Sequence, residues 1–191
     1  GATNFENLAG SSGNDTLRGD NNDNIIGGSY NFQGMMGGPG AQVGGTDTVY
    51  GNGGNDTIVA NGTLYGGSGN DSLTGGSGND TFDGGAGADT ITTNGGDDTI
   101  VLNAGAGGTA IADADIITDF QDGSDVVGMN GLSFADFSIA QGTGANSSHT
   151  LLANANNGNY LGILQNISSS DITAADFMST STSTLTFNGT S

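Results

Sequence analysis

The sequence predicts an all-β fold: a parallel β-roll (a two-sheet β-solenoid) of G-G-x-G-x-D-x-U-x repeats with an antiparallel C-terminal cap, where U is an apolar residue. Three observations carry this prediction. A glycine-rich unit of nine residues recurs through the first half of the chain. Each unit holds one apolar residue between small polar ones. After Leu102 the glycine period stops and longer strand-like segments begin.

The repeat is most regular between residues 66 and 101. Residues 66–74, 75–83 and 84–92 are consecutive full units, and 93–101 is a degenerate fourth copy. Earlier copies are a full unit at 10–18, a copy at 19–27 with Asn24 at the sixth position, part of a unit at 44–50 and a full unit at 51–59. Residues 60–65 keep the strand but lose half of the loop, so we expect a truncated unit there.

The eighth position of the unit is apolar in every copy. One apolar side chain between polar neighbours, bounded by glycine turns, predicts a very short strand with a single residue facing inward. The loop residues then reverse the chain, so two units complete one coil and two parallel sheets face each other. The expected inward residues are Leu17, Ile26, Val49, Ile58, Leu64, Leu73, Phe82, Ile91 and Ile100.

The repeat pattern divides the chain into three regions. Residues 1–102 are the predicted roll, interrupted near 29–41 by an irregular insertion that contains the only proline, Pro39. Residues 103–178 are the predicted capping region, since an open solenoid end must be covered. Residues 179–191 form a Ser/Thr-rich terminal extension. Because the chain opens at Gly1 rather than Met, we expect it to be an excised or processed piece.

Charge limits the possible partners. The 191 residues carry 20 acidic groups against one basic residue, Arg18, for a net charge of −19. Nucleic acids and anionic membrane surfaces are therefore excluded as partners, whereas cations are favoured. No apolar run reaches the length of a membrane span, so we expect no membrane insertion. Cysteine is absent, which excludes disulfide bonds.

An Asp closes most of the glycine-rich loops, at the sixth position of the unit. Calcium binds six to eight oxygens from carboxylates and backbone carbonyls, which such loops supply. Alternate units share an edge, so we expect ions between the loops of Asp56 and Asp71, of Asp71 and Asp89, and of Asp80 and Asp98. The predicted ligands are Asp15, Asp47, Asp56, Asp71, Asp80, Asp89 and Asp98, with backbone carbonyls around Gly51, Gly66, Gly75, Gly84 and Gly95.

The repeats and the region after them resemble the C-terminal part of RTX (repeats-in-toxin) proteins, which include secreted proteases, lipases, haemolysins, adhesins and surface-layer proteins. The resemblance covers about residues 4–178. It implies several Ca²⁺ ions in the loops, and a D-x-I-x-D-F-x-x-G-x-D segment after the roll, matched here by residues 115–125. Asp119 and Asp125 of this segment join the predicted ligands. The resemblance also implies a secreted, extracellular or cell-surface protein with a type I secretion signal near 167–177.

Catalytic residues are not expected. The chain has one His and one Glu, far apart, so the H-E-x-x-H zinc site of serralysin-type proteases cannot form. His149 lies in a Gly/Asn/Ser-rich segment, which favours a solvated turn over a catalytic triad. We therefore predict that the chain is not an enzyme and binds no organic cofactor.

The predicted function is that of a calcium-binding structural module that folds after export and self-associates head to tail into a filament or surface layer. The strand-like residues 185–187 and an uncovered first coil near 5–8 favour self-association. One alternative is a C-terminal secretion and folding module of a larger RTX enzyme or adhesin. The other is an adhesin segment that binds ice, or that binds carbohydrate such as a cell-surface or matrix polysaccharide. The carbohydrate role would use the aromatic residues Tyr30, Phe32 and Tyr50.

Overall fold

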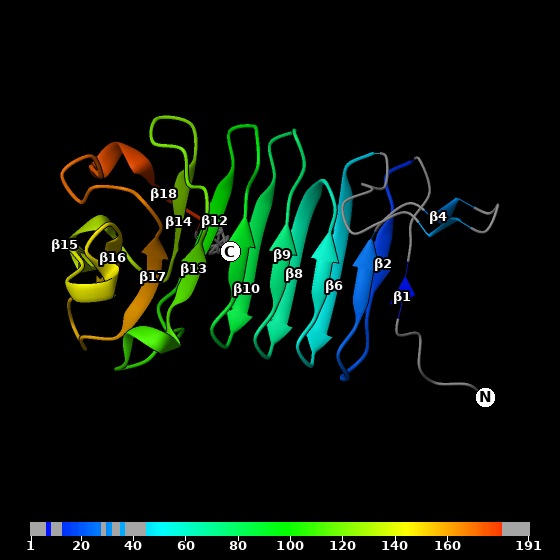
Figure 1. Cartoon of the computed structure of the whole chain (residues 1–191), viewed down its shortest axis with the longest axis horizontal. Helices are drawn as coiled ribbons and strands as arrows, with labels where there is room; N and C mark the ends of the chain where they lie inside the picture. The colour runs from blue at the N-terminus through cyan, green and yellow to red at the C-terminus, as the bar shows by residue number, and fades with distance from the viewer. Residues whose placement is uncertain (1–6, 9–12, 28–29, 32–34, 37–44, 181–191) are drawn as a thin grey trace, which may run out of the picture.

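The computed structural model describes residues 7–8, 13–27, 30–31, 35–36 and 45–180, with only the backbone of the three short pairs. Two sheets face each other along the long axis, and the chain passes from one to the other in each coil (Figure 1). The first sheet holds, in spatial order, β1 (Asn7–Leu8), β3 (Ile25–Gly27), β7 (Thr57–Val59), β9 (Ser72–Thr74), β11 (Thr90–Thr92), β13 (Asp115–Ile117), β17 (Tyr160–Leu164), β16 (Thr150–Asn154) and β15 (Phe137–Gln141).

The second sheet lies opposite the first. It holds β18 (Phe177–Ser179), β14 (Val126–Asn130), β12 (Thr99–Asn103), β10 (Thr81–Ala86), β8 (Gly62–Ser68), β6 (Asp47–Gly53) and β2 (Thr16–Arg18). Four single-turn 3₁₀ segments join strands in the C-terminal half: η1 (Ile111–Asp113), η2 (Phe134–Asp136), η3 (Gly144–Asn146) and η4 (Ala174–Asp176). No helix in the described part of the chain is long and apolar enough to cross a bilayer.

The register confirms that two units make one coil. Phe82 pairs with Leu64 on one side and with Ile100 on the other, all in parallel strands of the second sheet. Sixth-position residues of neighbouring coils, such as Asp71 and Asp89, are 18 residues apart. The truncated unit shortens its coil, so Asp56 and Asp71 are 15 residues apart and yet occupy equivalent places in adjacent layers.

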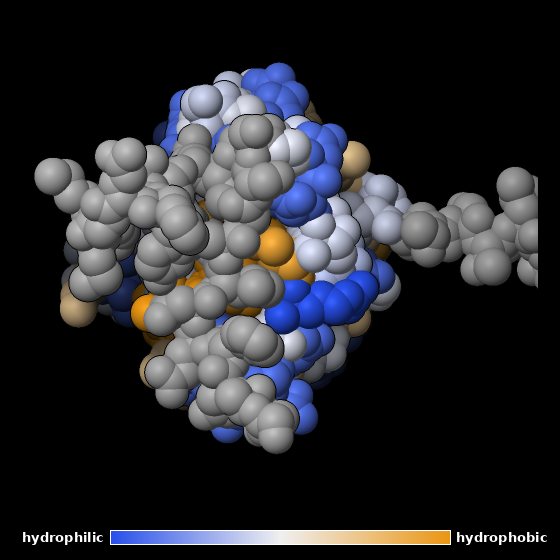
Figure 2. All heavy atoms as spheres, turned by 90° about the vertical axis from the view of Figure 1, so that its right-hand side faces the viewer, coloured by the Kyte–Doolittle hydropathy of each residue, from blue (hydrophilic) through white to orange (hydrophobic). Residues whose placement is uncertain are grey.

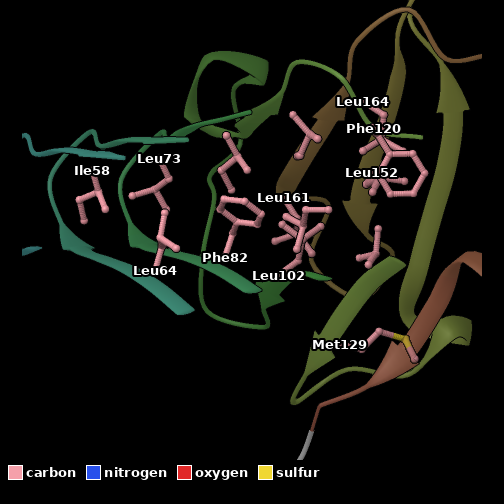
Figure 3. Packing of buried hydrophobic residues seen from close by; sticks show 14 of the residues in the cluster. Ile58, Leu64, Leu73, Phe82, Leu102, Phe120, Met129, Leu152, Leu161 and Leu164 are labelled. Atoms are coloured by element: carbon pink, nitrogen blue, oxygen red, sulfur yellow. The ribbon is translucent and has the colours of Figure 1, made fainter. Parts of the chain in front are cut away.

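The core of the roll consists of two facing rows of the predicted inward residues, one row from each sheet. Leu17 is 7% exposed, and the other eight are at most 1% exposed. Figure 3 shows Ile58, Leu64, Leu73 and Phe82 between the two sheets, followed by the larger cluster of the C-terminal half. Because each unit contributes one apolar side chain, this part of the core is thin.

The parallel stacking continues past Leu102, where we expected the antiparallel cap to begin. In the first sheet β13 and then β17 add in parallel to β11, and in the second sheet β14 and β18 add in parallel to β12. Among the described strands of the two main sheets, antiparallel pairing joins only β15, β16 and β17. The reason is that Ile117 and Val127 still follow an Asp by two residues, so each strand keeps its inward residue although its loop has lost the glycine spacing of the repeat.

The insertion predicted near 29–41 is described only in part. β4 (Tyr30–Asn31) and β5 (Met35–Met36) pair antiparallel outside the two main sheets. At the start of the chain, β1 pairs in parallel with β3 and so belongs to the roll. The strand-like residues 185–187 lie outside the described residues.

Candidate metal centres

The sixth-position residues form one row along each edge of the roll. Loops that lead from the second sheet to the first define the first edge, and loops that lead back define the second edge. The first-edge row is Asn24, Asp56, Asp71, Asp89 and Asp115. The second-edge row is Asp15, Asp47, Gly62, Asp80, Asp98 and Asp125.

Along the first edge, each carboxylate holds the backbone of the layer before it. Oδ1 of Asp56 accepts a hydrogen bond from the N–H of Asn24 (2.7 Å), and Oδ1 of Asp71 accepts one from the N–H of Asp56 (2.7 Å). Oδ1 of Asp89 continues the series with the N–H of Asp71 (2.8 Å). These Asp side chains are at most 3% exposed, so one oxygen of each is committed to the backbone inside the protein.

The second edge repeats this pattern with one interruption. Oδ1 of Asp47 accepts from the N–H of Asp15 (2.9 Å), and Oδ1 of Asp98 accepts from the N–H of Asp80 (2.7 Å). The truncated unit places Gly62 in the row, and its N–H donates to Oδ1 of Asp80. One layer of this edge therefore has no sixth-position carboxylate.

The second oxygen of five of these carboxylates has no hydrogen-bond partner. Within the described ranges these buried, unpartnered atoms are Oδ2 of Asp47, Asp56, Asp71, Asp89 and Asp98. An ionised oxygen that is buried without a donor or a cation costs several kcal/mol. Positive charge that would neutralise these oxygens is therefore missing in three consecutive layers of the first edge and in two separate layers of the second.

Backbone carbonyls converge on the same places. A Cβ added at Gly51 would collide with Oδ2 of Asp56 and with the carbonyl oxygen of Gly66, each less than 3.0 Å away. A Cβ added at Gly66 would collide in the same way with Oδ2 of Asp71 and the carbonyl oxygen of Gly84. A carboxylate from one layer and a carbonyl from the next thus face one small space, which only glycine leaves open.

These donors fit calcium. Ca²⁺ binds hard oxygen ligands in flexible geometry, and both carboxylates and backbone carbonyls belong to its usual set. Among the described residues, no three His, Cys, Asp or Glu side chains gather at one point. Each ion would therefore depend on few carboxylates and on several carbonyls, which matches a loop rich in glycine.

The other predicted ligands are engaged in hydrogen bonds with the backbone. Oδ2 of Asp80 accepts from the N–H of Gly76 (2.7 Å), and Oδ2 of Asp125 accepts from the N–H of Gln121 (2.9 Å). Asp119 lies beside the second-edge row and receives backbone N–H groups on both oxygens, from Thr93 (2.8 Å) and Asn94 (2.9 Å). Asp119 therefore ties one loop to another, whereas Oδ2 of Asp80 and Oδ2 of Asp125 each bond within their own loop.

Gly75 and Gly95, two of the predicted carbonyl ligands, have different surroundings from the glycines of the first edge. The carbonyl oxygen of Gly75 accepts a hydrogen bond from the side-chain amide of Asn94 (2.9 Å). Nothing lies within 4 Å of a Cβ added at Gly95. In contrast, Gly51, Gly66 and Gly84 each face an unpartnered Asp oxygen.

Asp115 occupies a place in the first-edge row that the sequence analysis did not assign. Its Oδ1 accepts from the N–H of Asp89 (3.0 Å), which is the contact that each repeat Asp makes, and it is 4% exposed. The missed signal is the spacing Asp115-Ile116-Ile117, which matches Asp89-Thr90-Ile91 in the last full unit. The five residues before Asp89 include three glycines, whereas the five residues before Asp115 include none, so the nine-residue pattern does not predict Asp115.

Burial raises the pKa values of several carboxyl groups of the two rows in the absence of a cation. Desolvation, together with the charges of neighbouring carboxylates, raises the pKa of Asp71 to about 6 and that of Asp98 to about 6. Desolvation raises the pKa of Asp115 to about 8, with Asp89 as an additional cause. A bound cation would remove this penalty on the charged forms, since opposite charge favours ionisation.

A roll of nine-residue units, whose edges present buried carboxylates and carbonyls to a shared space, defines a calcium-binding repeat module. The family of the RTX calcium-binding nonapeptide repeat (4 copies) matches residues 1–31, 43–63, 60–91 and 75–107, and the chain belongs to this family. No curated protein matches the sequence.

Two solved structures are similar to the chain. The extracellular lipase LipA from Serratia marcescens is 16% identical with a TM-score of 0.48, and the match covers 92% of this chain and 40% of the lipase. A subunit of the mannuronan C5-epimerase from Azotobacter vinelandii is 23% identical with a TM-score of 0.31, covering 88% of this chain and 80% of that subunit. The chain thus spans 40% of the length of the lipase.

Proposed function

We propose that the chain is a calcium-dependent structural module of a secreted protein, which folds when it meets calcium outside the cell. The observation that carries this proposal is the set of five buried Asp Oδ2 atoms without partners, three of which, on the first edge, each face a glycine. Calcium is scarce inside cells and abundant outside them. A chain that needs several ions would therefore stay unfolded during export and fold afterwards.

The charge of the chain supports the same mechanism. With a net charge of −19 and a single basic residue, the folded state brings like charges together along both edges. Self-repulsion of this kind destabilises a compact state until counter-ions bind. The thin core, with one apolar side chain per unit, adds little that would offset the repulsion.

Calorimetric titration with calcium tests this proposal. We expect several ions to bind with dissociation constants of roughly 10⁻⁴ to 10⁻³ M, the range of extracellular calcium modules. Magnesium should bind poorly, because it demands a small octahedral shell. Affinities of about 10⁻⁷ M or tighter would contradict a switch that acts only after export, and absence of binding would end the proposal.

The second part of the proposal is head-to-tail self-association. Within the described ranges the outermost strands are β1 and β15 in the first sheet and β2 at the N-terminal end of the second, and each of them pairs with one neighbouring strand only. Figure 2 views the N-terminal end and shows apolar atoms at its centre. Unpaired strand edges accept further strands, and contact between unlike ends of one chain generates filaments.

Carbohydrate binding through Tyr50 has less support. The Tyr50 ring stacks on Tyr65 with centroids 4.9 Å apart, and the Arg18 guanidinium lies 4.0 Å from the Tyr50 centroid. Arg18 and Tyr65 flank Tyr50 from the two neighbouring strands, so both faces of its ring are covered. A sugar would need one of these faces free.

Deletion of residues 179–191 tests self-association. We expect the shortened chain to fold with calcium as the full chain does, but to lose the oligomers or fibres that light scattering detects for the full chain. The physical reason is that strand-like residues 185–187 would supply the contact. If the full chain stays monomeric in millimolar calcium at high concentration, self-association is wrong. The chain would then serve as the folding module of a larger secreted protein.

A further inference from the structure

The truncated unit interrupts the second-edge row. Gly62 takes the place of the sixth-position Asp and pairs with Asp47 of the preceding layer. The residue before it, Asn61, is then the fifth residue of its unit, like Asn55, Asn70 and Asn79 in the regular units. A comparison of these asparagines shows what the truncation changes.

In regular units the fifth-position asparagine has a fixed structural contact. Oδ1 of Asn55 accepts from the N–H of Asn70 (2.8 Å), and Oδ1 of Asn70 accepts from the N–H of Ala88 (3.0 Å). Oδ1 of Asn79 accepts likewise from the N–H of Asp97 (3.0 Å). Each of these side chains thus holds the fifth residue of the next layer.

Asn61 does not follow this pattern. Its Oδ1 is buried and has no hydrogen-bond partner among the described residues. The loop around it is three residues shorter than a regular one, so its side chain does not hold the next layer as the others do. A buried amide oxygen without a partner costs about 1–3 kcal/mol of folding free energy. We therefore expect a partner for Oδ1 of Asn61 that is not part of the described chain.

A second unpartnered oxygen belongs to the adjoining layer. Asp47 is 1% exposed, its Oδ1 accepts from Asp15, and its Oδ2 is buried with no partner. The N–H of Asp47 donates to the carbonyl oxygen of Asn61 (2.7 Å), so the two residues are direct neighbours. An unpartnered carboxylate oxygen and an unpartnered amide oxygen therefore belong to two residues that are joined by a backbone hydrogen bond.

We propose that the truncated unit keeps a calcium site of its own, in which Oδ1 of Asn61 binds the ion together with Oδ2 of Asp47. Asn carbonyl oxygens are ordinary calcium ligands, so the amide substitutes for the missing sixth-position carboxylate. A related substitution exists on the first edge. There a Cβ added at Gly19 would lie 2.8 Å from Oδ1 of Asn24 and 2.6 Å from the carbonyl oxygen of Gly51. The inference rests on the proposed binding of calcium to the roll.

The number of bound ions tests this site. Asn61→Ala should bind one calcium ion fewer than the full wild-type chain, as counted by native mass spectrometry or equilibrium dialysis in saturating calcium. Asn79→Ala is the matched control, because it removes an asparagine of the same position whose oxygen is engaged with the backbone, and it should keep the wild-type number. An unchanged number for Asn61→Ala overturns the inference and leaves a buried water as the partner of both oxygens.

A charge-adding variant decides the question if Asn61→Ala does not fold. If an ion lies between residues 47 and 61, Asn61→Asp adds a carboxylate ligand to it. The calcium concentration at which half of the chains are folded should then fall at least about twofold. Without an ion, Asn61→Asp places a second buried carboxylate beside Asp47, which should lower the melting temperature and should not lower this calcium concentration. If the wild-type chain binds no calcium, the proposed function fails. If it binds calcium and both Asn61 variants behave against expectation, only this site is wrong.

Discussion

Removal of calcium is expected to unfold most of the roll. In EGTA the chain should lose most of its β circular-dichroism signal, and calcium added in excess should restore it. The cause is the set of five buried Oδ2 atoms that lack a partner, since the negative charge of each is uncompensated when the cation leaves. The core of the roll, with one apolar residue per unit in two facing rows, is too thin to hold the layers together against this repulsion.

Two controls make this result specific. Magnesium at the same concentration should restore much less signal, because it does not adapt to irregular loops rich in carbonyls. Sodium chloride at equal ionic strength should also fail, because screening acts weakly on buried charges. A spectrum that is unchanged in EGTA would show that the roll is stable without the ion.

The pKa values give the calcium-free chain a defined pH dependence. Burial raises the pKa of Asp71 to about 6 and that of Asp115 to about 8, so the folded state without calcium binds protons more tightly than the unfolded one. This stabilising contribution is fully present below the unfolded pKa of about 3.9 and is lost as the pH rises through about 6 and then about 8. In EGTA, more β signal should therefore remain at about pH 5 than at about pH 8.

Asp71→Ala is expected to be among the most destabilising single substitutions in the presence of calcium. Asp71 lies between two layers, accepting from the N–H of Asp56 through Oδ1 and donating its own N–H to Asp89. Its Oδ2 faces the space that the carbonyl oxygen of Gly84 also lines. Loss of a buried charged partner typically costs about 3–5 kcal/mol, which corresponds to a fall in melting temperature of roughly 6–20 °C for a chain of this size.

Asp97→Ala is the matched control for this substitution. Asp97 also lies in a repeat loop and carries the same charge, but its side chain is exposed and stands one position before the row. Exposed substitutions usually change stability by less than about 0.5 kcal/mol, so the melting temperature should change by about 2 °C or less. Equal effects of the two substitutions, measured by thermal unfolding in saturating calcium, would mean that the assigned register of ligands is wrong.

Much of the roll could be predicted from the sequence because its pattern is local. The nine-residue period and the single apolar eighth position predict both the coil and the inward side chain, and Ile58, Phe82 and Ile100 are buried as predicted. The truncated unit was also visible, since it shifts the spacing from Asp56 to Asp71 without breaking the alternation. Where glycines mark the turns, residues adjacent in the sequence determine the backbone conformation. Tertiary contacts then only stack layers of similar backbone.

The extent of the parallel sheets was harder to predict because the glycines end before the strands do. β13 and β14 join the roll through pairing with β11 and β12, although no full glycine-rich loop of the repeat precedes them in the sequence. The loops before β13 and β14 differ in length and composition from the repeat loops. The position of these two strands is therefore determined by their pairing with β11 and β12. The antiparallel pairing that was expected for the whole region occurs only from β15 to β17.

By itself, the sequence determined the solenoid, the residues inside it and the kind of ion, since each of these depends on a motif that a few adjacent residues define. Only the tertiary structure decided which carboxylates keep a buried oxygen without a hydrogen-bond partner. It also placed Asp115 beside Asp89, 26 residues away, and left Oδ1 of Asn61 without a partner next to Asp47. These features depend on which loop lies in the next layer, and that neighbour exists only once the coils have stacked.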